Sequence, residues 1–372
     1  MMPKLRILMF VDHNRSFMYV RAMKFREFIP RDRFDIRILF LDEYKKDKGK
    51  LFRLLRDLGK SIDVFYFFDI GSTKYWMALL ARLFYGIRII LDVGDDYYLL
   101  NRNKDVPFFK RMKIFFIQDL FYRIADRIVT RGFFHREYMK KKGYRNVIQI
   151  PDCVDPDHSY RRSPAGLRKK LGLDKSLVIG IMGSINWNRK YRICYGWDLI
   201  EAASQLKDLK IKILVIGDGD GLPYLKNRVR ELHIRDKVVF LGRVAYPDLP
   251  CYLSLFDIGI STQSNDRVGT FRTTGKLPEY LAHNIYIIAT RVGEASRRLQ
   301  KAGSLLPYRG IKDGSYPARL ASEIRRIYFN RSLLKKALLG RKIAAQHFNY
   351  KTQAGRMASL FLSVAGKNGD GA

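Results

Sequence analysis

Short apolar runs alternate with amphipathic stretches along most of the 372-residue chain, and this alternation restricts the fold more than any other feature. Parallel strands that are covered by helices on both faces give this pattern. The sequence therefore predicts an α/β fold. Strands are expected at residues 5–11, 35–41, 63–67, 88–93, 127–130, 147–150, 177–182, 212–216, 238–240, 257–260 and 286–289.

The chain is expected to divide near residues 151–166, which carry three prolines and no sustained hydrophobic period. Its length also favours two domains. We predict two Rossmann-like, doubly wound domains that face a cleft, at residues 1–160 and 161–348. Residues 349–372 are expected to form a helix that packs back on the first domain. Ligands of such sheets bind beyond the carboxyl ends of the strands, so functional residues should follow strands.

The charge balance points to anionic partners. Lys and Arg number 70 against 36 Asp and Glu, a formal charge of +34, which attracts phosphates, nucleic acids or an anionic membrane surface. No recognition-helix, RNP-like or zinc pattern accompanies the charge, so specific nucleic-acid binding is not expected. No targeting or transmembrane segment is predicted, and the three cysteines lack paired or metal-type spacing. These features predict a cytoplasmic protein, with peripheral contact to the inner face of a membrane as a further hypothesis.

The stretch VGTFRTTGKLPEYLAHNIYIIATRVGE, residues 268–294, offers a phosphate site. Thr273 and Thr274 are predicted N-caps of a helix at 275–282, whose free N–H groups and dipole suit an anion. Arg272 and Lys276 add charge, and Gly269 lets a ligand approach the backbone.

The same helix carries Glu279, whose carboxylate can accept two hydrogen bonds from a vicinal diol such as ribose. The alternative is a capped helix with a solvated glutamate.

In GIMGSINWNRKY, residues 180–191, a strand ends at Gly183 and Ser184, and Arg189 and Lys190 follow. Cations there could stabilise developing negative charge, or could simply belong to the basic excess. In VIGDGDG, residues 215–221, the acidic pair resembles a metal motif. We favour a strand-to-helix turn with a positive-φ glycine and a capping aspartate.

Asp92, Asp95 and Asp96 cluster in LDVGDDYY, residues 91–98, at the end of a predicted strand. Such carboxylates could bind sugar hydroxyls or orient an acceptor, and turn or cap chemistry is the alternative.

Residues 108–125, FFKRMKIFFIQDLFYRIA, combine an aromatic helical stripe with interleaved Lys and Arg. A helix of this kind can lie in an anionic membrane interface, or it can cover a sheet with a solvated basic face.

Residues 177–293 resemble the donor-binding half of a retaining GT-B glycosyltransferase of family 4. The likeness rests on ILVIGDGDGLPYLKNRVRELHIRDKVVFLGRVAYPDLPCYLSLFDIGIST followed by GKLPEYLAHNIYIIATRVGE, and ADRIVT and YMKKKGYRNVIQIPDCVD are consistent with it in the first half. The resemblance implies an N-terminal acceptor domain and a C-terminal domain that holds a nucleotide-sugar donor. It implies no metal ion and no cofactor besides the co-substrate.

The resemblance also implies residue roles. Glu279 matches the glutamate that holds the ribose hydroxyls, and Lys190 matches the lysine that faces the diphosphate. The turn beneath the phosphates matches residues 269–274, namely Gly269, Thr270, Phe271, Arg272, Thr273 and Thr274. The loop that closes over them matches Asp12, His13, Asn14, Arg15 and Ser16.

Three departures from the family pattern stand out. Phe271 replaces the first motif glutamate, and Ser184 replaces an arginine whose charge Arg189 is expected to supply. Gly94 replaces a histidine, so Asp95 is the candidate for the sugar-facing role, with Asp96 beside it. Lys190, Arg189 and Asp95 are thus the catalytic candidates of a hexosyltransferase-like enzyme that extends a polysaccharide or lipid-linked glycan. The alternative is a catalytically lapsed relative that binds nucleotide sugar or a polyanion.

Overall fold

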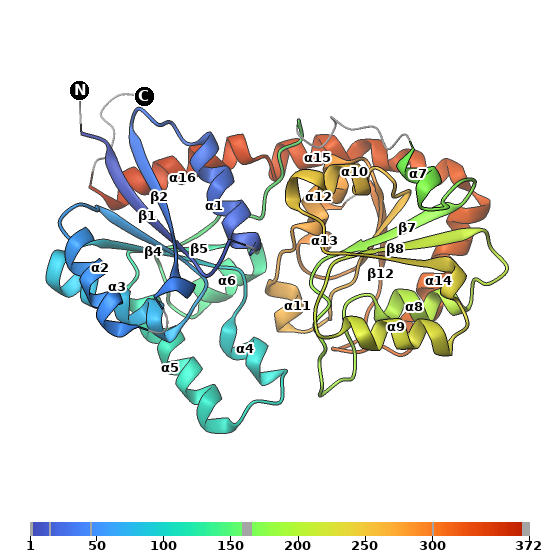
Figure 1. Ribbon diagram of the computed structural model, residues 1–372, viewed down its shortest axis with the longest axis horizontal. Coiled ribbons are helices and arrows are strands. Elements are labelled where there is room, and N and C mark those ends of the chain that lie inside the picture. Colours follow the sequence, from blue (N-terminus) through green and yellow to red (C-terminus); the bar gives the residue numbers. More distant parts are fainter. Residues whose placement is uncertain (1–2, 15, 45–46, 158–165, 300, 367–372) are drawn as a thin grey trace. The chain divides into compact units, whose positions relative to one another are not determined.

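The structure is a computed structural model that describes residues 3–14, 16–44, 47–157, 166–299 and 301–366. The chain forms two compact units. The first comprises Met1–Cys153, Phe271–Thr273 and Tyr350–Ala372, and the second comprises Val154–Thr270 and Thr274–Asn349. Each unit contains a parallel sheet with helices on its faces (Figure 1), so the predicted α/β class is confirmed.

The first unit has, in its described residues, a parallel six-stranded sheet in the order β2-β1-β3-β4-β5-β6. Its strands are β1 (Leu5–Val11), β2 (Phe34–Phe40), β3 (Val64–Phe68), β4 (Arg88–Val93), β5 (Arg127–Thr130) and β6 (Val147–Gln149). Its helices are α1 (Phe17–Phe28), α2 (Lys48–Leu58), α3 (Ser72–Tyr85), α4 (Tyr97–Arg102), α5 (Phe108–Ile124), α6 (Phe133–Lys141) and α16 (Tyr350–Val364), with a 3₁₀ turn η1 (Leu41–Glu43).

Strand β1 shows why this sheet is covered on both faces. Successive side chains of a strand point to opposite faces. Ile7 and Met9 belong to the core that α1 and α16 cover, whereas Leu8 and Phe10 belong to the core on the other face. Apart from Arg6 near its start, the strand is therefore apolar, as expected for a parallel strand buried on both sides.

The second unit repeats the plan with the order β12-β11-β10-β7-β8-β9 in its described residues. Its strands are β7 (Leu177–Met182), β8 (Ile211–Ile216), β9 (Val238–Gly242), β10 (Ile258–Ser261), β11 (Tyr286–Thr290) and β12 (Gly303–Leu306). Its helices are α7 (Leu167–Lys170), α8 (Trp197–Ser204), α9 (Leu222–Glu231), α10 (Leu249–Leu253), α11 (Arg267–Phe271, of which Phe271 falls in the first unit), α12 (Lys276–Ala282), α13 (Gly293–Arg298), α14 (Tyr316–Phe329) and α15 (Gly340–His347). The 3₁₀ segments are η3 (Arg235–Lys237), η4 (Tyr246–Asp248) and η5 (Arg331–Leu339).

The last helix, α16, belongs to the first unit. The ring of Tyr350, its first residue, lies edge-on to Phe25 of α1 at 5.6 Å between ring centres. No helix in the described part of the chain has the length and apolar character needed to cross a membrane.

Both sheets reverse their strand order at one point, between β1 and β3 in the first unit and between β7 and β10 in the second. Ligands of open α/β sheets bind beyond the carboxyl ends of the strands at such a reversal. The loops after β1, β3, β7 and β10 are therefore the places to look for functional residues.

Candidate functional site

Helix α12 of the second unit presents a buried carboxylate. Glu279 is 5% exposed and accepts a hydrogen bond from the hydroxyl of Tyr246 at 3.0 Å. The next residue, Tyr280, accepts a hydrogen bond from the backbone N–H of Met182, the last residue of β7, at 3.0 Å. This bond ties α12 to the strand reversal. The alternative of a solvated Glu279 is therefore wrong, and its carboxylate is positioned to accept further hydrogen bonds from hydroxyl groups.

Lys276 of the same helix extends across the end of β7. Gly183 follows β7 with φ at 139°, and a Cβ atom added there would lie 2.8 Å from Cε and 2.9 Å from Nζ of Lys276. The ammonium also lies 4.2 Å from the centre of the Tyr195 ring. Ser184 is the next residue and is exposed. The structure therefore places Lys276 beside Gly183 at the strand reversal, and Ser184 is the next residue in the chain.

Gly269 in α11 is held by its own loop. Its N–H donates to Asp266 Oδ1 at 2.9 Å, and its carbonyl accepts from Gln263 Nε2 at 3.1 Å. A Cβ atom at Gly269 would lie 1.9 Å from the carbonyl oxygen of Ser264. The close approach predicted for a ligand is thus made by the Ser264 backbone. Thr270 follows and is half-buried.

The prediction that Thr273 and Thr274 cap helix α12 is wrong. Gly275 is the N-cap of α12, and no side-chain hydrogen bond caps this helix. The hydroxyl of Thr273 donates to Asp152 Oδ2 at 3.0 Å, within the first unit, so it is not available for capping. Thr274 uses its carbonyl, which accepts from the N–H of Leu277 at 3.2 Å.

Arg189 and Lys190 lie exposed at the tip of a short hairpin. Asn188 and Ile193 close the hairpin through hydrogen bonds of 2.9 and 3.4 Å between their backbones. The Lys190 ammonium lies 5.5 Å from the centre of the Tyr191 ring. The role of both cations at a diphosphate stays a prediction.

Residues 217–220 after β8 form the predicted strand-to-helix turn. Gly217 and Gly219 have φ at 138° and 151°, as the predicted turn requires. The predicted capping aspartate is wrong, because Gly221 is the N-cap of α9 and no side chain caps this helix. Asp220 Oδ1 instead accepts from the backbone N–H of Trp187 at 2.8 Å.

In the first unit, the loop after β1 reaches the strand reversal. Asp12 Oδ2 accepts from the ammonium of Lys74, on the helix that follows β3, at 3.0 Å. Ser16 is the N-cap of α1 and accepts from the helix backbone at 3.1 Å. The other predicted loop residues are His13 and Asn14, which are exposed, and Arg15, which lies outside the described residues.

Asp95 and Arg272 pair with each other. Both belong to the first unit, and Arg272 donates to the two carboxylate oxygens of Asp95 at 2.7 and 3.2 Å. Burial alone would raise the pKa of Asp95, but the Arg272 charge and hydrogen bonds outweigh burial and lower it. Asp95 is therefore held ionised, and Arg272 positions it.

Asp96 has a different role from the one predicted for it beside Asp95. Its Oδ1 accepts from the backbone N–H of Leu99 at 2.9 Å, as the N-cap of α4, and from Gln118 Nε2 at 3.2 Å. Of the two roles considered for Asp96, the structure supports the helix cap and not the binding of an acceptor.

Asp92 lies in a fully buried ionic cluster that the sequence did not predict. Its carboxylate accepts from Arg21 at 2.9 Å, from the Tyr66 hydroxyl at 2.6 Å and from Arg131 at 3.0 Å. Burial opposes ionisation, but the two guanidinium groups lower the pKa of Asp92. Only Asp92 stood out in the sequence, because its partners are distant in the chain.

His135 of α6 is a second buried residue that the sequence did not predict. It is fully buried, and its ring stacks on Phe271 with centres 5.3 Å apart. Neither ring nitrogen has a hydrogen-bond partner in the described part of the chain. Burial lowers the pKa of His135 to about 4, so the imidazole is neutral at pH 7. Phe271 thus has a packing role in the first unit.

Part of the chain matches a known protein family. Residues 176–330, less than half of the chain, match the family model "Glycosyl transferases group 1". This segment includes the end of β7, Lys276 and Glu279. Most of the second unit is thus similar to the group 1 glycosyl transferases, and the predicted resemblance to a GT-B glycosyltransferase is confirmed.

Curated relatives align with part of their length. The 2-deoxystreptamine glucosyltransferase of Streptomyces kanamyceticus is 26% identical over 231 residues, which cover 60% of this chain and 56% of that protein. The alpha-monoglucosyldiacylglycerol synthase of Streptococcus pneumoniae is 30% identical over 105 residues, which cover 28% of this chain and 23% of that protein.

Among solved structures, that of HepE from Anabaena in complex with UDP-glucose is similar with a TM-score of 0.77. The likeness covers 96% of this chain and 100% of that chain at 16% sequence identity. At that identity the likeness establishes the fold.

Proposed function

We propose that the protein is a retaining glycosyltransferase that moves a hexose from a nucleotide sugar to a glycan or lipid-linked glycan. The observation that carries this proposal is the pair Lys276 and Glu279 on one helix at the strand reversal of the second unit, inside the family match. UDP-glucose is the first donor to test, because a structurally similar protein binds it and a relative is named a glucosyltransferase.

In this proposal the second unit holds the donor. Glu279 accepts hydrogen bonds from the two ribose hydroxyls, because its buried carboxylate is oriented by Tyr246. Lys276 and Ser184 contact the diphosphate near the end of β7, and Arg189 and Lys190 add positive charge as the donor reacts. Gly269, Thr270 and Thr274 contribute the turn beneath the phosphates.

The transfer itself needs no pair of flanking carboxylates. The bond from the anomeric carbon to the diphosphate breaks, and the bond to the acceptor oxygen forms on the same face. The acceptor proton passes to a diphosphate oxygen. The protein then supplies positioning and charge stabilisation. The proposal requires neither a metal ion nor a cofactor besides the nucleotide sugar.

Asp95 is the proposed sugar- or acceptor-orienting residue of the first unit. Its ion pair with Arg272 keeps it ionised and fixes its direction. The side chains of Arg272 and Thr273 are already engaged by Asp95 and Asp152, so we assign them a positioning role.

The test is transfer from UDP-glucose, followed by NMR spectroscopy of the product. Lys276→Ala and Glu279→Ala should each lower kcat/KM by about 100-fold or more, whereas the exposed control Lys335→Ala should not change it. An α-linked product from the α-linked donor supports retention. Full activity in both site variants would refute the assignment of the site.

A lapsed enzyme is the second candidate, because Phe271 replaces a motif glutamate and is buried against His135. It predicts that nucleotide sugars bind without transfer or hydrolysis. Detection of either product decides between the two candidates.

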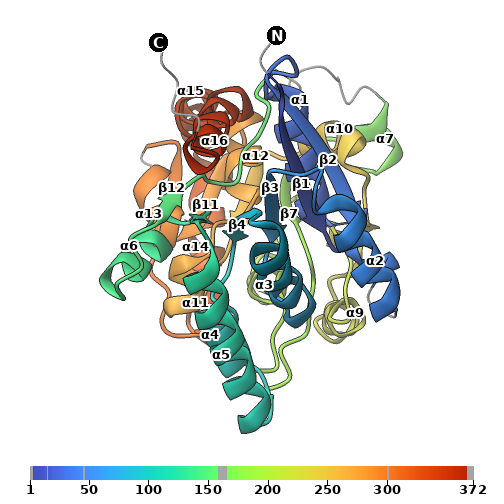
Figure 2. The same cartoon turned by 90° about the vertical axis from the view of Figure 1, so that its left-hand side faces the viewer.

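Helix α5 supports the further proposal that the enzyme works at an anionic membrane surface. Its C-terminal half covers the sheet, where Phe121 and Tyr122 are buried. Its N-terminal half exposes Phe108, Phe109 and Phe116, with Phe109 85% exposed, and it extends beyond the sheet of the first unit (Figure 2). Exposed aromatic rings among lysines and arginines favour an anionic interface.

Vesicle co-sedimentation at low salt tests this surface. Vesicles that contain anionic phospholipid should retain the wild type, and Phe109→Ser/Phe116→Ser should lose most of the binding. Phe329→Ser is the matched control, because Phe329 is 71% exposed on α14 of the second unit. Wild-type binding by the double variant would exclude α5 as the membrane contact.

A further inference from the structure

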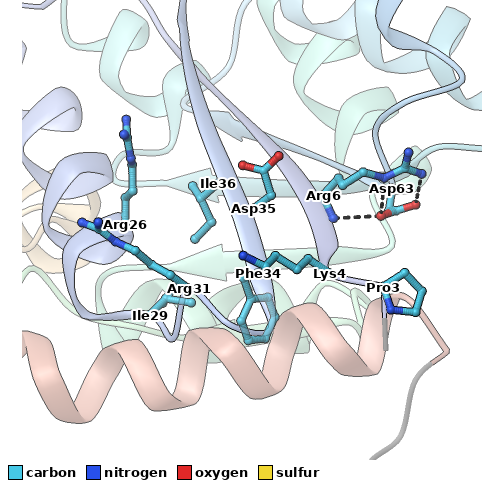
Figure 3. Close-up of a pocket in the computed structure, with 10 residues that line it drawn as sticks. All are labelled: Pro3, Lys4, Arg6, Arg26, Ile29, Arg31, Phe34, Asp35, Ile36 and Asp63. Carbon is cyan, nitrogen blue, oxygen red and sulfur yellow. Dashed lines mark hydrogen bonds and ion pairs between the residues drawn. The ribbon is translucent and has the colours of Figure 1, made fainter. Parts of the chain in front are cut away.

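A basic cavity lies in the first unit, apart from the site residues discussed so far. Its volume is about 730 Å³, within the usual range for sites of small molecules. Lys4 and Arg6 border it at the start of β1, and Arg26 and Arg31 border it at the end of α1 and in the following loop. Figure 3 shows Arg26 and Arg31 on one side and Arg6 with Asp63 on the other, with Lys4 extending between them over Phe34.

The acidic residues of this cavity are already paired. Arg6 donates to the two carboxylate oxygens of Asp63 at 2.8 and 3.2 Å, and Asp35 accepts from Arg37 at 3.1 Å. These pairs leave three other cations.

Those three cations are unneutralised by protein groups. Within the described part of the chain, the side chains of Lys4, Arg26 and Arg31 have no hydrogen bond or ion pair. Three like charges around one hollow repel each other, so an anion would be bound favourably there.

The base of the cavity is apolar. Ile29, Phe34 and Ile36 line it and are buried. Guanidinium groups bind phosphate in a bidentate way, and an apolar base accommodates the organic part of a ligand. The combination fits an organic phosphate better than a metal ion or an uncharged sugar.

The cavity is also distant from the predicted acceptor residues. It lies at the amino ends of β1 and β2, whereas Asp12 follows the carboxyl end of β1. The seven residues of β1 separate these ends by roughly 20 Å. The exposed end of α5 likewise lies at the far end of this unit from the start of β1 (Figures 1 and 2). A flat membrane at α5 would therefore leave the cavity in water.

We propose that this cavity is a binding site for a phosphate-bearing small molecule from solution, separate from the donor site. Lys4, Arg26 and Arg31 bind the phosphate oxygens, and Ile29, Phe34 and Ile36 contact the organic portion. Arg6 is a positioning residue that Asp63 holds at the rim.

The test uses calorimetric titration of pyrophosphate at constant ionic strength, with no nucleotide sugar present. Arg26→Ala/Arg31→Ala should weaken binding by about tenfold or more. Lys140→Ala/Lys141→Ala removes the same charge from exposed positions on α6 and should bind as the wild type does. Pyrophosphate also resembles the donor diphosphate, so the titration is repeated in Lys276→Ala. Arg26→Ala/Arg31→Ala should cause the same loss in that background, which distinguishes failure of the donor assignment from failure of this one.

Two results would overturn the proposal. Equal affinity in the wild type and Arg26→Ala/Arg31→Ala would exclude the cavity, and equal losses in the two double variants would show a general charge effect. A second experiment, binding to vesicles, distinguishes a lipid headgroup from a soluble phosphate compound as the ligand. Arg26→Ala/Arg31→Ala should bind phosphatidic acid vesicles like the wild type, and loss there would identify a lipid headgroup and refute a soluble ligand. An unchanged thermal unfolding midpoint in this variant shows that its fold is intact.

Discussion

Asp198 makes the stability of the second unit depend on pH. It lies in the first turn of α8, is 7% exposed and accepts from the Tyr308 hydroxyl at 3.3 Å. Burial raises the pKa of Asp198 from 3.8 to about 7, and the Tyr308 hydrogen bond opposes this only in part. The folded state thus holds the proton more tightly than the unfolded state. Its contribution to stability is fully present below about pH 4 and is lost as the pH rises through about 7.

Asp198→Asn removes this titration and keeps an oxygen that can accept from Tyr308. Each pH unit in the window between the two pKa values changes the free energy of unfolding by about 1.36 kcal/mol. Between pH 5 and pH 8, the variant should therefore gain roughly 3 kcal/mol of stability relative to the wild type.

Urea unfolding at pH 5, 6, 7 and 8 measures this difference, because groups common to both proteins cancel. The exposed Asp174→Asn is the matched control and should run parallel to the wild type at every pH. A difference between Asp198→Asn and the wild type that stays constant from pH 5 to pH 8 would refute the assigned titration.

Two further substitutions test packing, one in the buried cluster around Asp92 and one at the strand reversal of the second unit. Asp92→Asn should lower the free energy of unfolding by about 3 kcal/mol, because it removes the carboxylate that bonds to both buried guanidinium groups. Arg131 keeps Asp69 at 3.2 Å, whereas the remaining carboxylate of Arg21 is Asp152 at 3.9 Å. Urea unfolding measures this, and a loss below about 1 kcal/mol would contradict the buried cluster. Gly183→Ala should weaken UDP-glucose binding in calorimetry, because its Cβ displaces the Lys276 ammonium. Gly310→Ala is its control, since φ there is also positive but no atom lies within 4 Å of an added Cβ; equal losses of affinity would point to backbone strain alone.

Buried parallel strands were predictable because each is a short apolar run between polar segments. Strands β1, β4 and β7 begin and end where the sequence predicts. Strand β12 was missed because Gly303–Leu306 is a half-buried edge strand with a weak apolar signal.

The position of Glu279 was also predictable, since a lone carboxylate in an apolar helix after a strand indicates a buried acceptor. Pairings between residues that are distant in the sequence could not be predicted. Asp95 and Arg272 are 177 residues apart, and local patterns carry no information about which cation faces which carboxylate. For the same reason, the hydroxyl of Thr273 looked free to cap α12 although Asp152 engages it.

The central claim is that the second unit binds a nucleotide-sugar donor through Glu279. The most direct test is thermal unfolding of the wild type and Glu279→Ala with UDP-glucose, UDP, and GDP-, ADP-, CMP- and dTDP-sugars. A ligand at about 100 times its Kd should stabilise the wild type by about 2.7 kcal/mol. We predict that one nucleotide class raises the midpoint of the wild type and leaves Glu279→Ala unchanged. No shift with any nucleotide, or the same shift in both proteins, would contradict the assigned site.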